Sequence, residues 1–164
     1  YEAARVGAAV VAELPEPGAG LNGPGASVRI VHNARYRLGM FTSIQAGARA
    51  VESPWFFVLP GDLPLVQPST FEAVAGELDR LERAEEADPA VDVIVPVVAG
   101  TRGHPVLIRS SLIPALSTAA SDAGPMRRFV SRYRVHRFDH DDVGIIRDVD
   151  TTEALDTLDQ GNLD

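Results

Sequence analysis

The sequence predicts an α/β protein, a three-layer α/β/α sandwich around a mostly parallel, Rossmann-like sheet. Two near-continuous apolar runs, FFVL at 56–59 and VDVIVPVV at 91–98, lack the alternation of a half-exposed strand. Such runs are typical of strands covered on both faces. Helical patterns lie between the strands, and this alternation indicates a sheet with helices on its faces. At 164 residues the chain corresponds to a single domain, 1–164.

The elements of the first half follow from periodicity and from breakers. Apolar residues at near-helical spacing predict a helix over 2–14 that ends before Pro15. A loop rich in Pro and Gly follows, and then VRIVHN at 28–33 reads as a strand. The segment 39–51 predicts a helix with one apolar face, and the run after Trp55 is the next strand.

The second half continues this alternation. Pro68 opens a helix to about Glu86, because proline suits the first helical position and apolar residues line one face. Strands follow at 91–98 and 104–108, joined by a glycine turn. We expect helices near 109–119 and 125–133, extended segments at 134–139 and 144–150, and a last helix from about Thr152 to Leu158.

Composition excludes several classes of function. The net charge is −8, all 15 basic residues are arginine, and cysteine is absent. An acidic chain disfavours a broad nucleic-acid surface, and a chain without thiols has neither disulfides nor a thiolate metal site. Because no apolar stretch approaches the roughly 18 residues of a membrane span, we expect a soluble protein without membrane partners. The lack of cysteine fits a cytoplasmic setting, and the acidic charge predicts no nucleic-acid partner.

A lone carboxylate interrupts the apolar pattern at PGDLP, where Asp62 follows the strand at 55–59. Ligands of open α/β sheets bind at the carboxyl ends of the strands. An aspartate among prolines and a glycine also serves as a local turn residue. Both interpretations of Asp62 stay open on this stretch alone.

A second acidic site lies at RDVD, where Asp148 and Asp150 precede a predicted helix. Asp150 fits an ordinary helix N-cap, and a cap is compatible with a role as metal ligand. Two carboxylates from two strand ends, without thiol or histidine partners, form a hard oxygen site suited to Mg²⁺. Because Mg²⁺ usually also binds substrate phosphates, this site predicts a nucleotide substrate.

Two further segments are candidates for ligand contacts. GMFTSIQAG offers Gly39 and hydroxyl groups near a helix N-terminus, although Ser43 also reads as a plain N-cap. GTRGHPVLI places Arg102 and His104 in a glycine turn before a strand. A lone histidine is usually structural, and a substrate contact is the alternative.

In chain order, GMFTSIQAGARAV, FFVLPGDLPLVQPSTFEAV, IVPVVAGTRGHPVLI and RDVDTTEAL together resemble the MobA-like nucleotidyltransferases. Within them the likeness is closest to the molybdenum cofactor cytidylyltransferases, and it runs over about residues 1–159. The resemblance implies a fold of the nucleotide-diphospho-sugar transferase type. It also implies catalytic and metal-binding roles for Asp62 and Asp150, nucleotide binding by Gly39, Met40, Ser43, Gly61 and Asp62, and acceptor binding by Arg102, Gly103, His104 and Pro105.

The start of the chain departs from that family. Its members open with a strand, a glycine-rich loop carrying an arginine and a lysine, a helix and a second strand. This chain opens with YEAARVGAAVVAEL, which matches the helix after that second strand. We therefore expect the sheet to lack its first βαβ unit and the chain to be an N-terminally incomplete part of a longer polypeptide.

The resemblance implies a Mg²⁺-dependent nucleotidyltransferase. It would move a nucleoside monophosphate from CTP, or GTP, to molybdopterin, release pyrophosphate, and deliver its product to a molybdoenzyme. One alternative is transfer to a sugar phosphate or another phosphorylated acceptor. A different class also stays open, a non-catalytic nucleotide-binding or interaction domain without the phosphate loop.

Overall fold

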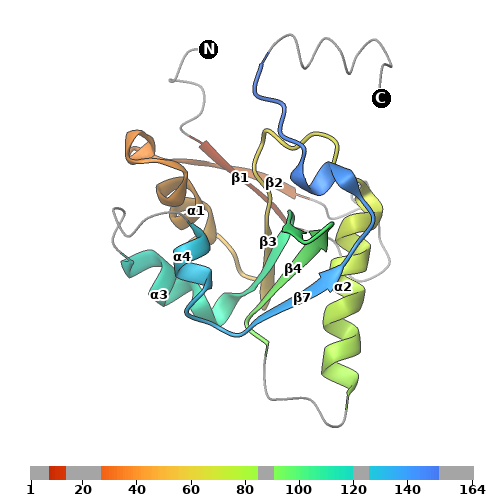
Figure 1. Ribbon diagram of the computed structural model, residues 1–164. Coiled ribbons are helices and arrows are strands. Elements are labelled where there is room, and N and C mark those ends of the chain that lie inside the picture. The colour runs from red at the N-terminus through yellow and green to blue at the C-terminus, as the bar shows by residue number, and fades with distance from the viewer. Residues whose placement is uncertain (1–7, 14–26, 85–90, 120–125, 152–164) are drawn as a thin grey trace. The chain divides into compact units, whose positions relative to one another are not determined.

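A computed structural model describes residues 8–13, 27–84, 91–119 and 126–151 (Figure 1). The chain divides into two compact units. Unit 1 comprises Tyr1–Phe56 and Ile108–Arg134, and unit 2 comprises Phe57–Leu107 and Val135–Asp164. Each unit is described below by itself.

The fold is α/β, as predicted, with a central five-stranded sheet. Its strands follow the order β3-β6-β4-β5, and β7 also pairs with β4. β4 and β7 run parallel, with Val93 opposite Val135 and Val97 opposite Asp139. The strand bounds are β3 Trp55–Val58, β4 Val93–Val98, β5 Thr101–Arg102, β6 Val106–Arg109 and β7 Val135–Asp139.

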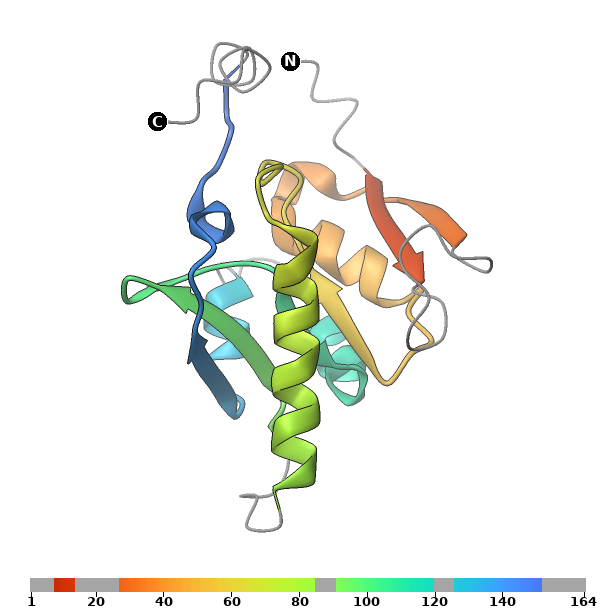
Figure 2. The same ribbon diagram turned by 90° about the vertical axis from the view of Figure 1, so that its right-hand side faces the viewer.

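Unit 2 is built around the buried strand β4 and the helix α2 (Pro68–Arg83), which contacts it (Figure 2). The apolar run of β4 explains this position, because Val93 and Ile94 are fully buried. Proline begins α2, as predicted, and Val74 is fully buried on its inner face. Burial of each such side chain contributes about 1.5–3 kcal/mol to folding.

A tight hairpin joins β4 to the antiparallel strand β5. Its two central residues, Ala99 and Gly100, both have positive φ, 49° and 77°. Two-residue hairpins of type I′ require positive φ at both positions, because that backbone twist matches the twist of the strands. The hairpin places Arg102 at the start of the segment that leads to β6.

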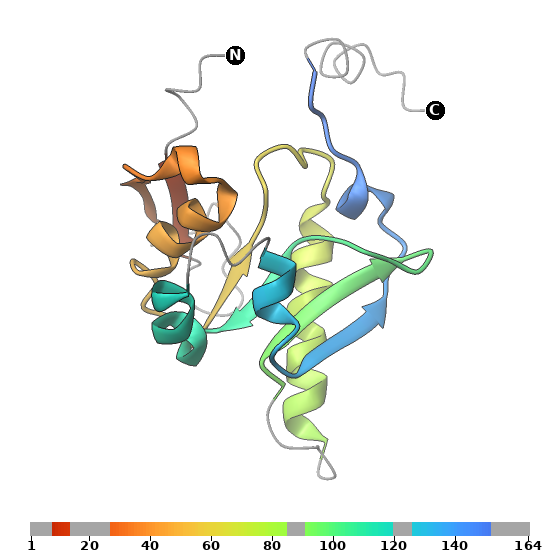
Figure 3. The ribbon, with the colours of Figure 1, turned by 60° about the vertical axis from the view of Figure 1, so that its left-hand side comes forward.

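Unit 1 holds a separate two-stranded antiparallel sheet and several short helices. β1 (Ala8–Glu13) pairs with β2 (Ser27–His32), and α1 (Met40–Ala48) contacts β1 and α3 (Figure 3). Phe41 of α1 packs against Phe129, at 6.1 Å between ring centroids. The remaining elements are the 3-10 helices η2 (Tyr36–Leu38) and η3 (Ser110–Leu112), and the α-helices α3 (Ile113–Thr118) and α4 (Met126–Val130).

Two sequence expectations were wrong. Residues 8–13 form β1 and not part of a helix over 2–14, because an Ala- and Val-rich run also suits a strand and its backbone pairs with Ser27–His32. The segment 144–150 is not a strand end. It begins inside the 3-10 helix η4 (Val143–Ile146) and continues without regular structure to Asp150. The predicted helix from Thr152 to Leu158 lies outside the described residues.

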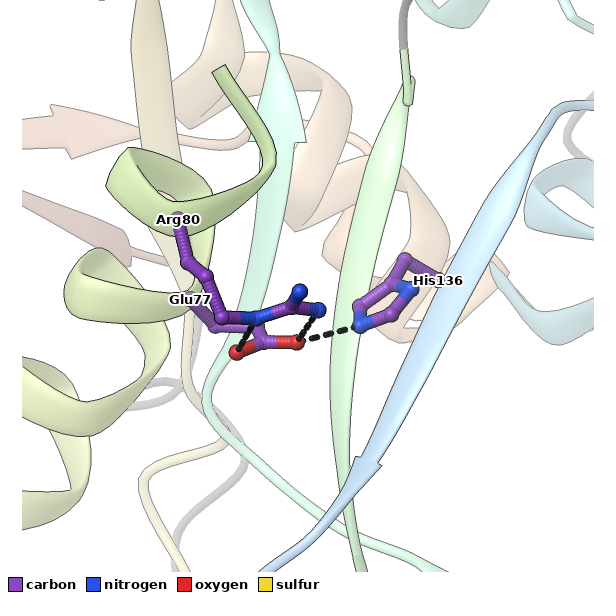
Figure 4. Close-up of polar contacts among 3 residues, drawn as sticks. All are labelled: Glu77, Arg80 and His136. Atoms are coloured by element: carbon purple, nitrogen blue, oxygen red, sulfur yellow. Dashed lines mark hydrogen bonds and ion pairs between the residues drawn. The ribbon is translucent and has the colours of Figure 1, made fainter. Parts of the chain in front are cut away.

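An ion-pair network fastens α2 to β7 at the level of Glu77 (Figure 4). The Glu77 carboxylate accepts hydrogen bonds from Arg80, at 2.9 Å from Nε and 2.7 Å from Nη2. His136 Nε2 lies 2.6 Å from Glu77 Oε1. Hydrogen bonding from Arg80 lowers the pKa of Glu77 against the opposing effect of burial, and His136 lowers it further.

We expect Glu77→Gln to lower the melting temperature at pH 7 by a few degrees, because it removes the charge shared by two partners. A carboxylate whose folded pKa is depressed stabilises the fold above its unfolded pKa of about 4.5. The difference in melting temperature between Glu77→Gln and wild type should therefore shrink as the pH falls below about 4.5 and through the lowered pKa of Glu77 in the folded protein. Glu82→Gln, at an exposed position of the same helix, is the matched control. Equal melting temperatures for the two variants at pH 7 would contradict this account.

Candidate active site

The first predicted carboxylate lies in the loop after β3, residues 59–67, which we call the Asp62 loop. Leu63 is buried and anchors the loop, whereas Gly61 and Asp62 are exposed. The buried leucine directly after an exposed aspartate places one side chain in the protein interior and leaves the other in solvent. The loop therefore presents Asp62 at its surface while its backbone is held.

The second carboxylate follows η4, in residues 142–150, which we call the late segment. Fully buried Ile145 holds this segment against unit 2, while Asp148 and Asp150 are exposed. The Val149 amide donates a hydrogen bond of 2.7 Å to the Asp62 carbonyl. This bond brings the Asp62 loop and the late segment together within unit 2, and Figure 3 shows the two segments next to each other. Asp150 is the next residue after Val149.

Gly144 makes the contact between these segments close. A Cβ at this position would collide with the backbone carbonyl of Leu65 and would also crowd the Asp142 carboxylate. Because the obstacle is backbone, no side-chain rotation relieves it. Glycine at 144 therefore lets the late segment pack directly on the Asp62 loop.

The glycine turn before β6 joins the same site through the late segment. The His104 amide donates to the Ile145 carbonyl at 3.0 Å, and Gly103 leaves no room for a Cβ beside the Ile145 side chain. Arg102 is exposed, whereas Pro105 is fully buried after a cis peptide bond. Unit 2 thus brings together Gly61, Asp62, the turn 102–105 and the segment carrying Asp150.

The environment of His104 favours its neutral form. Burial lowers the pKa of its imidazole, and this outweighs the opposite effects of the Val58 carbonyl and of the Asp62 charge. Nδ1 lies 3.3 Å from the Val58 carbonyl oxygen, which only accepts hydrogen bonds, so Nδ1 carries the proton. Neutral His104 therefore keeps Nε2 as an acceptor for a donor group.

The segment expected to bind the nucleotide lies in unit 1. Gly39, with φ of 102°, precedes α1, and Met40 is exposed although it is apolar. The Asn33 amide donates to Thr42 Oγ1 at 2.8 Å and to Ser43 Oγ at 3.0 Å. Because Ser43 Oγ accepts this bond, its own proton is available to a ligand.

Sequence reasoning missed Asn33, which is 4% exposed and orients both hydroxyl groups. Its own carbonyl oxygen accepts from the Arg35 amide at 2.9 Å, so the side chain is fixed at both ends. An asparagine directly after a strand, nine residues before a hydroxyl-bearing helix start, is the signal that was available. The spacing alone did not separate it from an ordinary turn residue.

The donor set in unit 2 fits a hard divalent cation. Within the described residues no group of three or more His, Asp or Glu side chains could hold a metal ion. Mg²⁺, however, takes one or two protein carboxylates and completes its octahedron with water and substrate phosphates. Among the residues that the structure describes, none donates a hydrogen bond to the carboxylate of Asp62 or Asp150. Both carboxylates are therefore available as ligands.

Comparison with known proteins adds a family and a fold. The sequence matches the model of the MobA-like NTP transferase domain over residues 3–138. No curated protein matches the chain. No helix in the described parts is long and apolar enough to cross a membrane.

Three solved structures share the fold. The crystal structure of Rv0371c from Mycobacterium tuberculosis H37Rv has a TM-score of 0.55 and 21% identity, over 72% of this chain and 58% of that one. The same protein in complex with manganese gives 0.54 and 22%, over 71% and 59%. A homolog from mycobacterium sp. strain JC1 gives 0.53 and 20%, over 73% and 56%. The chain thus spans less than two thirds of the length of each.

Nuclear magnetic resonance tests the state of His104. We expect its imidazole to titrate with a midpoint below 6.5, because burial disfavours the charged form. Asp62→Asn should lower the midpoint further by removing a favourable negative charge. Asp139→Asn, at the exposed end of β7, should leave it unchanged. A midpoint above 6.5 in the wild-type protein would contradict the assignment.

A pair of glycine substitutions tests the packing of the late segment. Gly144→Ala should destabilise the protein by about 1–3 kcal/mol, because the added methyl group meets backbone. Gly76→Ala, in α2 with open space around it, should stabilise by about 0.5–1 kcal/mol through helix propensity. Denaturant unfolding measures both, and a neutral Gly144→Ala would show that the two segments separate easily.

Proposed function

The chain belongs to the MobA-like NTP transferase domain family, and on this premise we propose that it is a nucleotidyltransferase that transfers a nucleoside monophosphate from a nucleoside triphosphate to a phosphorylated acceptor. An acceptor phosphate oxygen attacks the α-phosphorus, the bond to the β-phosphate oxygen breaks, and pyrophosphate leaves. The nucleophile and the leaving group both carry negative charge. The protein therefore contributes mainly alignment and charge neutralisation.

The observation that carries the proposal is the hydrogen bond from Val149 to the Asp62 carbonyl, because it joins the two carboxylate-bearing segments. Asp62 and Asp150 would hold a divalent cation, which when bound neutralises phosphate charge. We propose Mg²⁺ as the resident ion. The complex of Rv0371c with manganese supports divalent-cation binding in proteins of this fold.

The other residues have roles that follow from their chemistry. The Arg102 guanidinium is exposed and suits a phosphate of the acceptor. Neutral His104 would accept, at Nε2, a hydrogen bond from an N–H or O–H group of the acceptor molecule. Gly103 and Pro105 shape that turn. Gly61 would admit close approach of phosphate to the Asp62 loop.

In unit 1, the exposed Met40 side chain and the Ser43 hydroxyl would contact the nucleotide, next to Gly39, which is exposed and has no side chain to obstruct a ligand. The finer assignment, CTP or GTP as donor and molybdopterin as acceptor, rests on the resemblance of the four sequence segments. We propose that the product passes to a molybdoenzyme in the cytoplasm.

Asp62→Asn should leave the protein folded but reduce Mg²⁺-dependent transfer at least about 100-fold, because it removes a charge that holds the ion. Asp150→Asn should act similarly, and Asp139→Asn should retain wild-type turnover. The measurement is label transfer from each of the four nucleoside triphosphates to molybdopterin and to sugar phosphates, with the polypeptide of the complete reading frame.

The acceptor panel also separates the alternatives. Transfer to sugar phosphates alone would move the assignment to that acceptor class. Nucleotide binding without transfer to any acceptor would indicate a non-catalytic domain. Wild-type turnover by Asp62→Asn would remove Asp62 from the mechanism.

A further inference from the structure

Asp142, in the late segment, lies outside every motif that the sequence offered, yet its carboxylate has three hydrogen bonds. Oδ2 accepts from the Gln67 amide at 3.0 Å and from Thr70 Oγ1 at 2.6 Å, and Oδ1 accepts from the Gly144 amide at 2.8 Å. Two of these donors are at the start of α2 and one is in η4. A single side chain therefore ties the late segment to the end of the Asp62 loop.

The bond to Gln67 completes the N-terminus of α2. Gln67 is the N-cap position, and its own side chain makes no capping hydrogen bond. The N-terminal amides of a helix need acceptors and favour a negative charge. Asp142 supplies both from 75 residues away in the sequence.

The single proton of the Thr70 hydroxyl fixes the direction of the hydrogen bond between His140 and Thr70. The hydroxyl of Thr70 has one proton and gives it to Asp142, because a carboxylate only accepts. His140 Nε2, at 3.0 Å from Thr70 Oγ1, must therefore be the donor of that pair. The chain His140, Thr70, Asp142 is thus directional, and Thr70 is fully buried within it.

These hydrogen bonds keep Asp142 ionised. Burial would raise the pKa of its carboxyl group, but the bonds from Gln67, Thr70 and Gly144 and the nearby His140 together lower it. The network therefore remains intact across the neutral pH range. Asp142 is therefore ionised, both of its carboxylate oxygens accept hydrogen bonds from the protein, and we do not assign it as a metal ligand.

Three contacts connect the late segment with the Asp62 loop and the start of α2. Asp142 binds at Gln67, Gly144 packs on the Leu65 carbonyl, and Val149 binds the Asp62 carbonyl. The first contact is formed by a side chain and can be removed without altering the backbone. The other two contacts involve backbone atoms of the Asp62 loop.

We propose that Asp142 is a positioning residue for the divalent-cation site, and that it sets the separation of Asp62 and Asp150 without touching the ion. This inference rests on the proposed function, because it presumes that these two carboxylates hold a cation. Residues that orient metal ligands typically change metal affinity 10–100-fold when mutated. The same range is expected here, through Asp142 and, more weakly, through Thr70.

A purely structural role of Asp142 predicts a different result. Loss of a helix cap and a buried hydrogen bond lowers stability, but leaves the cation affinity of the folded fraction unchanged. Cation affinity measured on folded protein therefore separates the two roles. Glu77→Gln, which weakens the attachment of the same helix elsewhere, is a control for lowered stability.

The experiment is titration with Mn²⁺ alone, followed by water-proton relaxation, on protein shown to be folded by circular dichroism. We expect Asp142→Asn to raise the Mn²⁺ dissociation constant about tenfold or more. Asp141→Asn, the exposed neighbour, and Glu77→Gln should match wild type. Thr70→Val should raise the constant, and Thr70→Ser, which keeps the hydroxyl, should restore most of the affinity.

An unchanged dissociation constant in Asp142→Asn, with a lowered melting temperature, would overturn the proposal. If Asp142→Asn does not fold, equal affinities of Thr70→Val and Thr70→Ser would overturn it instead. An Mn²⁺ dissociation constant that is unchanged in Asp62→Asn would also overturn the proposal. Binding that depends on Asp62 and Asp142 in a protein that transfers no nucleotide would refute only the proposed function.

Discussion

The backbone hydrogen bond between the Val149 amide and the Asp62 carbonyl is the constraint on which the candidate site depends. It joins a loop that follows β3 to a segment that follows β7, and these are separated by most of unit 2 in the sequence. Backbone pairing of this kind fixes the chain without using a side chain. The neighbouring carboxylates of Asp62 and Asp150 therefore stay exposed and available for a ligand.

Acidic groups near the site divide into two kinds. Asp142 is occupied by three donors and works inside the protein. Among the described residues, none donates a hydrogen bond to the carboxylate of Asp62 or Asp150, and both side chains are exposed. Both carboxylates are therefore open to solvent or to a bound cation. A site for a phosphate-bound ion needs both kinds, because free ligands must be held on segments that do not move apart.

Much of the fold could be predicted from local pattern, and the errors have physical causes. The buried run of β4 and the proline start of α2 were predicted, because burial and proline act locally. Residues 8–13 were misassigned because their pairing with β2 is non-local.

The site was predicted only in part. Asp62 and Asp150 stood out at element ends, whereas Asp142 and Asn33 did not, because their partners lie far along the chain or share no recognisable motif.

The most direct test of the shared-cation role is a crystal soaked with Mn²⁺ and a non-hydrolysable CTP analogue, with anomalous diffraction locating the ion. The account predicts one peak at about 2.1–2.2 Å from a carboxylate oxygen of both Asp62 and Asp150. A peak that contacts only one of them, with the other carboxylate more than about 10 Å away, would contradict it.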